Sequence, residues 1–157
     1  QQVNPVALEP AIAPHIAAAE AGRRLIASQL AGYCRGVMMS GSDLVVVEGA
    51  GGWRTPINQR ETFANLAMEL NIPVILVVNM REGCINNGML SAEVIRRDGL
   101  RLAAWVANSN AEAMPYYQEN LSILKDQIPA PLLGEVPHLT GPNPRSIAGY
   151  LDLNILL

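Results

Sequence analysis

The stretch PVILVVNMREGCINN, residues 73–87, decides the fold class. Its first part, residues 73–79, contains an unbroken run of Val, Ile and Leu at 74–78, which is typical of a parallel strand buried on both faces. The loop Met80 to Ile85 follows, and then a helical pattern from Asn86 to Asp98 that Gly99 can end. A buried strand that leads through a short loop into a helix is the repeating unit of an α/β sheet.

The same alternation continues on both sides of this stretch. Further strands are expected at residues 43–48, 102–108 and 132–136, and further helices at residues 16–21, 25–39, 61–70 and from Pro115 to just before Pro129. We therefore expect an α/β fold, with a parallel sheet flanked by helices and right-handed crossovers. A chain of 157 residues fits a single domain, residues 1–157, with one core.

Composition and charge narrow the class of protein. Half of the residues are hydrophobic and 4% are aromatic, and no apolar run approaches the roughly 20 residues of a membrane span. We therefore expect a soluble protein without a membrane partner. The net charge is −3 and the basic residues are scattered, so nucleic acid is not an expected partner. The two cysteines are far apart, which favours a reducing, cytoplasmic location.

Polar residues end three of the expected strands. These residues are Glu48, Asn79 and Asn108. Any one of them could simply be a solvated strand end, but together they would line the carboxyl edge of the sheet. Ligands of open α/β sheets bind at that edge.

The segment VEGAGG, residues 47–52, combines an acidic side chain with a run of small residues. Mg²⁺ usually takes one or two protein carboxylates together with phosphate oxygens, and backbone amides of small residues can face those phosphates. The segment therefore predicts a metal and nucleotide site at Glu48. The phosphate-binding consensus G-x-x-x-x-G-K-[ST] does not occur in the 157 residues.

The loop before the helical pattern at residues 86–98 predicts a second site, for an anion. Free amides and the helix dipole favour a carboxylate or a phosphate at a helix start. Asn86 could instead serve only as the N-cap. Cys84 is expected to pack rather than to act as a nucleophile, because no histidine lies near it in sequence. For His15 and His138 we favour exposure or capping over catalysis.

Several motifs together resemble one enzyme family, the dethiobiotin synthetases, which are ATP-dependent ligases of biotin biosynthesis. The motifs are EPAIAPHIAAAEAG (9–22), VEGAGGWRTP (47–56), PVILVVNMREGCINN (73–87), LAAWVANSN (102–110) and IPAPLLGEVP (128–137). The resemblance implies a P-loop NTPase-like α/β fold and, usually, a homodimer. It also implies the conversion of 7,8-diaminononanoate, CO₂ and ATP into the cyclic urea dethiobiotin, with ADP and phosphate as the other products. One substrate amine forms a carbamate, ATP phosphorylates it, and the second amine closes the ring by expelling phosphate.

The resemblance also assigns roles to residues. Glu48 would be the catalytic Mg²⁺ ligand, and Gly49, Ala50 and Gly51 would lie at the nucleotide phosphates. Asn108 and Ser109 would match the strand end that reads adenine, and Pro137, His138 and Leu139 would match the loop beside the base. Thr55 and Pro56 would face the diamine, while Gly83, Cys84, Ile85 and Asn86 would hold its distant carboxylate across the dimer interface. Arg145 departs from the pattern, since the family can have a glutamate about there that contacts the nucleotide.

Parts of the family pattern do not occur in these residues. They are the first strand, the P-loop with its Lys and Thr, the second strand with a catalytic lysine, and a further Mg²⁺-binding aspartate. The resemblance therefore implies a carboxyl-terminal portion, incomplete at its amino-terminal end and inactive alone. Two alternatives remain open: the lobe of a cobyrinate-type ATP-dependent amide ligase, and a non-catalytic half that only binds nucleotide or dimerises.

Overall fold

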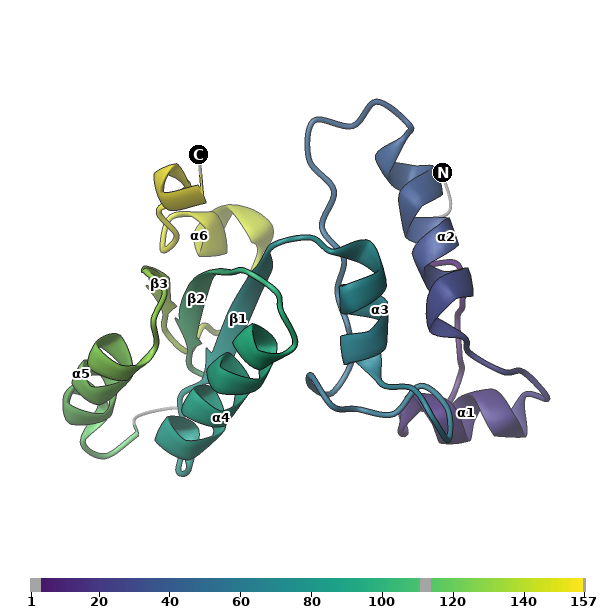
Figure 1. Ribbon diagram of the computed structural model, residues 1–157. Helices are drawn as coiled ribbons and strands as arrows, with labels where there is room; N and C mark the ends of the chain where they lie inside the picture. Colours follow the sequence, from purple (N-terminus) through teal and green to yellow (C-terminus); the bar gives the residue numbers. More distant parts are fainter. Residues whose placement is uncertain (1–3, 111–113, 157) are drawn as a thin grey trace. The chain divides into compact units, whose positions relative to one another are not determined.

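A computed structural model describes residues 4–110 and 114–156 of the chain. The chain divides into two compact units, residues 1–72 and 73–157, which are described here one after the other (Figure 1). Each unit has its own hydrophobic cluster. That residues 1–157 form a single domain with one core stays a prediction.

The first unit is built from helices. They are α1 (Pro14–Glu20), α2 (Ala27–Met38) and α3 (Phe63–Leu70), close to the three helices expected from the sequence. Thr62 begins α3 with a capping box, in which its amide donates to Asn65 Oδ1 over 2.8 Å. The core of this unit consists of small and aliphatic side chains from these helices and from the loop before α3: Ala18, Leu25, Ala27, Ala31, Ile57 and Leu66.

The strand expected at residues 43–48 is absent from the structure. These residues carry no strand assignment, and within the described chain they take part in no sheet. Leu44 and Val46 are each 80% exposed. The prediction was wrong because a Val-rich sequence supplies apolar side chains, whereas a strand also needs a neighbouring backbone to pair with.

The second unit contains a parallel sheet. Its strands are β1 (Val74–Asn79), β2 (Leu102–Asn108) and β3 (Leu132–Val136), in the spatial order β1-β2-β3. Both neighbouring pairs are parallel, which confirms the predicted parallel sheet flanked by helices. The central strand β2 is buried almost throughout, as its sequence predicts. The prediction that β1 is buried on both faces is wrong: β1 lies at an edge of this sheet, and Ile75 and Val77, on one of its faces, are 43% and 59% exposed.

Helices cover the two faces of the sheet (Figure 1). On one face lie α4 (Cys84–Arg97) and α5 (Tyr117–Gln127), and α4 begins two residues earlier than the sequence pattern suggests. On the other lies α6 (Pro144–Ala148), whose Ile147 packs against the cluster formed by Ala104, Val106, Leu133 and Val136. A short 3₁₀ helix, Leu153–Leu156, ends the described chain. In the part of the chain that the structure describes, every helix is too short or too polar to cross a bilayer.

Candidate functional site

The carboxyl ends of β1 and β2 lie side by side. Asn79 and Asn108 are partners in the parallel ladder, and the amide of Met80 donates to the carbonyl of Asn108 over 2.8 Å. The amide of Ser109 donates to Val136 O over 2.9 Å and so joins the end of β2 to β3. Two of the three polar strand ends therefore share one edge, as predicted. Glu48 does not belong to this set, because no strand precedes it.

A short loop, residues 80–83, joins the end of β1 to the start of α4. Gly83 is the N-cap, with φ +82°, and no side chain caps the helix. Asn86 therefore is not the N-cap, and that alternative is wrong. The amide of Cys84 is already used, since it donates to Arg81 O over 2.9 Å. Among the described residues, the amides of Ile85 and Asn86 donate to no backbone carbonyl, so this helix start can bind a carboxylate or a phosphate.

The first turn of α5 lies next to this helix start, which the sequence did not reveal. Asn120 Oδ1 is 4.0 Å from the sulfur of Cys84. Cys84 is 1% exposed, which agrees with its predicted packing role. Tyr116, the N-cap of α5, has a positive φ of 55°, and its carbonyl accepts from both the backbone amide and the side chain of Asn120. No spacing rule predicts contacts between residues that lie 36 positions apart on different helices.

A polar network connects α5 to the strand ends. Tyr117 Oη donates to Glu135 Oε2 over 3.4 Å, and Lys125 Nζ lies 3.1 Å from Glu135 Oε1. Burial raises the pKa of Tyr117, and the nearby Glu135 carboxylate raises it further. A hydrogen bond from the Ser109 side chain opposes the increase in that pKa. The network therefore includes Ser109, one of the residues expected at the nucleotide base.

The remaining residues expected at the base follow β3. Pro137 and His138 are exposed and Leu139 is half-buried. At the end of β2, Asn108 Nδ2 donates to Asn110 Oδ1 over 2.6 Å. Arg145 is exposed in α6. His15 does not cap α1, and its Nδ1 has no hydrogen-bond partner among the described residues.

In the first unit, the residues predicted as a site lie in the loop at residues 48–56. The carbonyl of Trp53 accepts from Ala64 N and that of Thr55 from Phe63 N, each over 3.0 Å. These bonds attach the loop to the first turn of α3 and satisfy amides that a helix start leaves without partners. Thr55 is thereby half-buried, while Pro56 is exposed.

The small residues of this loop are open to a ligand. Within the described residues, the amides of Gly49, Ala50 and Gly51 donate to no other backbone carbonyl. Glu48 is exposed, and nowhere in the described chain do three or more His, Cys, Asp or Glu side chains gather as a metal site. A single carboxylate still fits Mg²⁺ in donor chemistry, because this ion commonly takes one or two carboxylates and completes its shell with phosphate and water.

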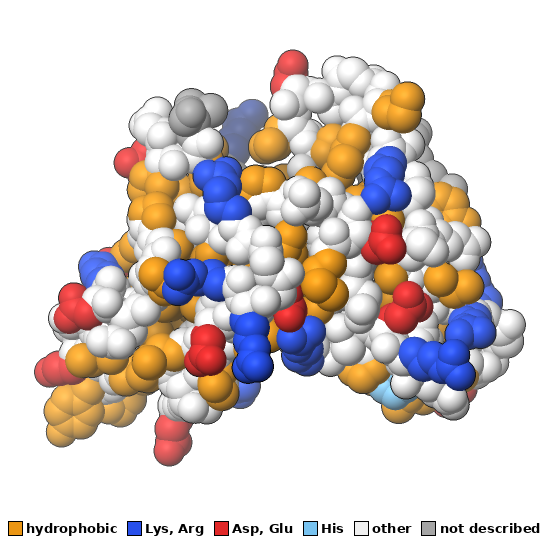
Figure 2. Space-filling model, in the orientation of Figure 1, with side chains coloured by type: hydrophobic (Ala, Val, Ile, Leu, Met, Phe, Trp, Pro, Cys, Tyr) orange, Lys and Arg blue, Asp and Glu red, His pale blue; other side chains and the backbone are white. Residues whose placement is uncertain are grey.

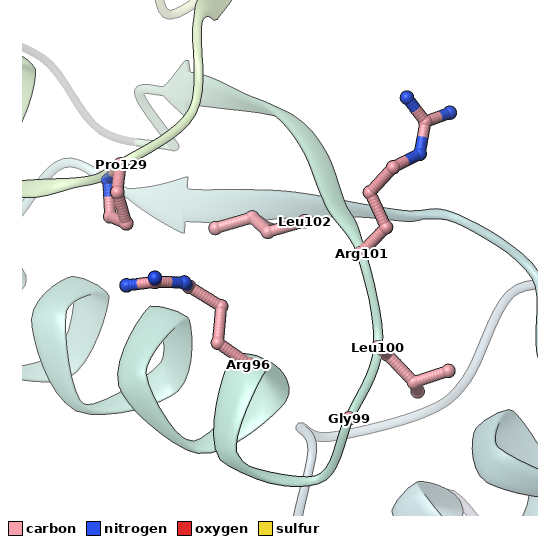
Figure 3. A pocket seen from close by; sticks show the side chains of 6 residues that line it. All are labelled: Arg96, Gly99, Leu100, Arg101, Leu102 and Pro129. Atoms are coloured by element: carbon pink, nitrogen blue, oxygen red, sulfur yellow. The ribbon is translucent and has the colours of Figure 1, made fainter.

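The second unit also has a shallow hollow at the other end of its strands. Arg96, Gly99, Leu100, Arg101, Leu102 and Pro129 line it. Figure 3 shows the Arg96 side chain extending toward Pro129 and that of Arg101 pointing away. Leu102 is the first residue of β2, so the hollow lies at the opposite strand end from Asn108 and is separate from the candidate site. On the face shown in Figure 2, basic side chains are scattered among acidic and apolar ones.

Comparison with known proteins identifies the family of this chain. A family model described as an AAA domain matches residues 1–145. A protein of Cellvibrio japonicus named ATP-dependent dethiobiotin synthetase is 54% identical over 157 residues, covering 100% of this chain and 68% of that protein. Proteins of the same name from Pseudomonas paraeruginosa and Aeromonas salmonicida are 51% and 44% identical over 99% of this chain, which spans 68% and 69% of their lengths. The chain belongs to the family of ATP-dependent dethiobiotin synthetases.

Proposed function

We propose that this chain acts in the ATP- and Mg²⁺-dependent formation of dethiobiotin from 7,8-diaminononanoate and CO₂, with ADP and phosphate as the other products. The observation that carries the proposal is the 54% identity, over all 157 residues, to a protein named for this synthesis. The curated relatives reported above all have the same name, and none is named as a cobyrinate-type ligase.

The second unit would bind the base of the nucleotide and the carboxylate of the diaminononanoate. Asn108 and Ser109, with residues 137–139, would contact the nucleotide base. The start of α4 would bind the carboxylate of the diaminononanoate through the backbone of Gly83 to Asn86. The free amides of Ile85 and Asn86 support this role, since a helix start without a side-chain cap favours an anion.

The first unit would supply the phosphate side of the reaction. The amides of Gly49, Ala50 and Gly51 would donate to phosphate oxygens, and Glu48 would hold Mg²⁺. When bound, this ion would neutralise negative charge on the nucleotide phosphates. Thr55 and Pro56 would face the diamine, and the two bonds from α3 to the loop keep Thr55 in a fixed position.

The chemistry that these residues would serve is mainly positioning. A carbamate oxygen formed from the first amine and CO₂ attacks the terminal phosphorus of ATP, and ADP leaves. The second amine then attacks the carbamate carbon, loses its proton and expels phosphate as the ring closes. Holding the amine and the mixed anhydride close together removes most of the entropic cost of ring closure.

A homodimer belongs to the same proposal, because the carboxylate clamp at Gly83 to Asn86 would serve the partner's substrate. The cytoplasmic location expected from the two free cysteines is likewise a proposal.

Product analysis tests this function. The full-length gene product would be incubated with 7,8-diaminononanoate, bicarbonate, ATP and Mg²⁺, and dethiobiotin and phosphate would be measured together. We expect equal amounts of both products, and no phosphate when the diamine is omitted. Phosphate release without a cyclic urea, or turnover that persists with excess chelator, would contradict the proposal.

A further inference from the structure

We propose that Asn58 and Glu61 are positioning residues for the ring-closing step, because they fix the tilt of the backbone hairpin that carries Thr55. This hairpin consists of residues 53–64. The inference rests on the proposed function, which puts Thr55 at the diamine. It adds two residues to which the sequence pattern assigned no role in the site and which act through Thr55 rather than on the substrate.

Two hydrogen bonds attach the base of the hairpin to the first turn of α3, through the carbonyls of Trp53 and Thr55. A bridge between Pro56 and Thr62 joins the two arms, so the arms move together. Two points of attachment define an axis, and the hairpin can still tilt about it. Ile57 packs into the core from the middle of the hairpin, but apolar contacts have no preferred direction. A third polar attachment, away from this axis, is needed to fix the direction of the Thr55 side chain.

Asn58 provides such an attachment at the tip of the hairpin. Its Oδ1 accepts from Arg60 N over 2.8 Å and from Glu61 N over 2.9 Å. Because two backbone amides point at this oxygen, the Nδ2 arm of the carboxamide points the other way. Nδ2 donates to the carbonyl of Leu25 over 2.7 Å and also to Glu61 Oε2. Asn58 therefore closes the turn at the tip and joins it to the residues just before α2.

Glu61 makes a second connection from the tip to α2. Its Oε2 accepts over 3.3 Å from the amide of Ala27, the first residue of α2. The N-cap residue Ile26 gives this helix no side-chain cap, so a carboxylate 34 positions along the chain takes that place. Ala27 is 1% exposed. The tip is thus attached to the buried start of a helix rather than to another surface loop.

A positioning role and a purely structural role differ in what they change. Loss of stability lowers the fraction of folded enzyme and with it the rate, but it leaves KM and the ratio of the two products unchanged. A displaced Thr55 would instead leave the second amine badly placed. Water then attacks the carbamate carbon in its place, phosphate leaves, and the carbamic acid that forms breaks down to the free amine and CO₂. The amount of phosphate would then exceed that of dethiobiotin.

Asn58→Asp in the full-length gene product tests the inference. The new carboxylate still accepts from the amides of residues 60 and 61, so the turn is kept. It cannot donate to the Leu25 carbonyl, and it repels Glu61. We expect KM for the diamine to rise by about tenfold, and phosphate to exceed dethiobiotin by at least about threefold. Glu61→Ala, which removes the other connection and adds no charge, should change both quantities in the same direction.

A swapped pair and a matched control complete the experiment. In the double variant Asn58→Asp with Glu61→Gln, the glutamine can donate to the aspartate and still accept from Ala27 N. It should bring KM back to within about threefold of wild type. Glu69→Gln is the control, because Glu69 Oε2 lies 3.7 Å from Arg35 Nη2 and so joins α3 to α2 away from the hairpin. It should leave KM and the product ratio unchanged, even where it lowers the free energy of unfolding.

The outcomes separate this inference from the proposed function. If Thr55→Ala leaves KM for the diamine and the product ratio unchanged, the proposed diamine site is wrong and the inference fails with it. If Thr55→Ala changes either quantity while Asn58→Asp and Glu61→Ala change neither, only the inference is overturned. Equal changes in Asn58→Asp and Glu69→Gln, or a swapped pair no better than Asn58→Asp alone, would also overturn it.

Discussion

A Cβ atom added to Gly51 would lie 2.6 Å from Oγ1 of Thr55. The two residues belong to different parts of the proposed site, since Gly51 is expected at the phosphates and Thr55 at the diamine. Gly51 also has φ +85°, a conformation that costs other residues roughly 1–2 kcal/mol. The backbone of this loop therefore allows Thr55 to occupy its place only if residue 51 has no side chain.

Gly51→Ala is expected to reduce catalysis by displacing Thr55. The kcat/KM of the full-length gene product for the diamine should fall by at least about tenfold. Gly52→Ala is the matched control, because its φ is not positive and its added Cβ would lie 4.0 Å from Thr55 Oγ1. Equal losses in the two variants, or none in either, would show that the Gly51–Thr55 contact does not position the substrate.

Asn86→Asp is expected to weaken binding of the diaminononanoate. A carboxylate in the first turn of α4 repels the substrate carboxylate, so KM for the diamine should rise by about tenfold while kcat changes little. The same charge favours the positive end of the helix dipole, so the free energy of unfolding should not fall.

Steady-state kinetics with a charge control checks this prediction. Ser122→Asp puts an equal charge on an exposed position of α5, away from the helix start, and should leave KM unchanged. A KM that rises equally in both variants would point to a general charge effect rather than to a carboxylate site at α4.

Tyr117 is expected to make stability depend on alkaline pH. Burial and Glu135 hold its pKa above the ordinary value of 10, so the unfolded chain loses the phenolic proton first. Stability from this group is therefore present below pH 10 and is lost as the pH rises through the folded-state pKa. Ultraviolet titration should show a late tyrosinate component that Tyr117→Phe removes. Tyr116→Phe, at a residue 76% exposed, should leave it in place. A late component that survives in Tyr117→Phe would refute the assignment.

Gly134→Ala is expected to destabilise the second unit. The added Cβ would lie 1.9 Å from the carbonyl oxygen of Tyr150, and the backbone of β3 is fixed by its ladder with β2. Overpacking of this kind costs about 1–3 kcal/mol, which urea unfolding of the full-length gene product can measure. Gly149→Ala is the control, since its nearest neighbour would be Ser146 O at 3.7 Å. A loss confined to Gly149→Ala would contradict the packing described here.

Local sequence patterns were sufficient to predict much of this fold. The bounds of β2 and β3 agree with the predicted strands, because buried parallel strands are unbroken apolar runs between polar or Pro/Gly residues. The pattern failed at residues 43–48, where a similar run lacks a pairing partner in the described chain. Apolar content does not specify what lies beside a strand.

In the candidate site too, local sequence patterns predict some of the residues and fail to predict others. Asn79 and Asn108 could be predicted as candidate residues because each ends an apolar strand, and the loop before α4 could be predicted because it follows such a strand. The pair Tyr117–Glu135 and the contact of Cys84 with Asn120 could not, because they join residues 18 and 36 positions apart whose approach depends on helix packing.

The most direct test of the account is Glu48→Gln in the full-length gene product, with ATP- and Mg²⁺-dependent formation of dethiobiotin as the measurement. The substitution keeps the size of the side chain and removes the charge that would hold the metal. We expect turnover to fall by at least about a hundredfold, while ATP binding without Mg²⁺ stays within about threefold of wild type. Unchanged turnover would remove Glu48 from the mechanism and contradict the proposed metal site.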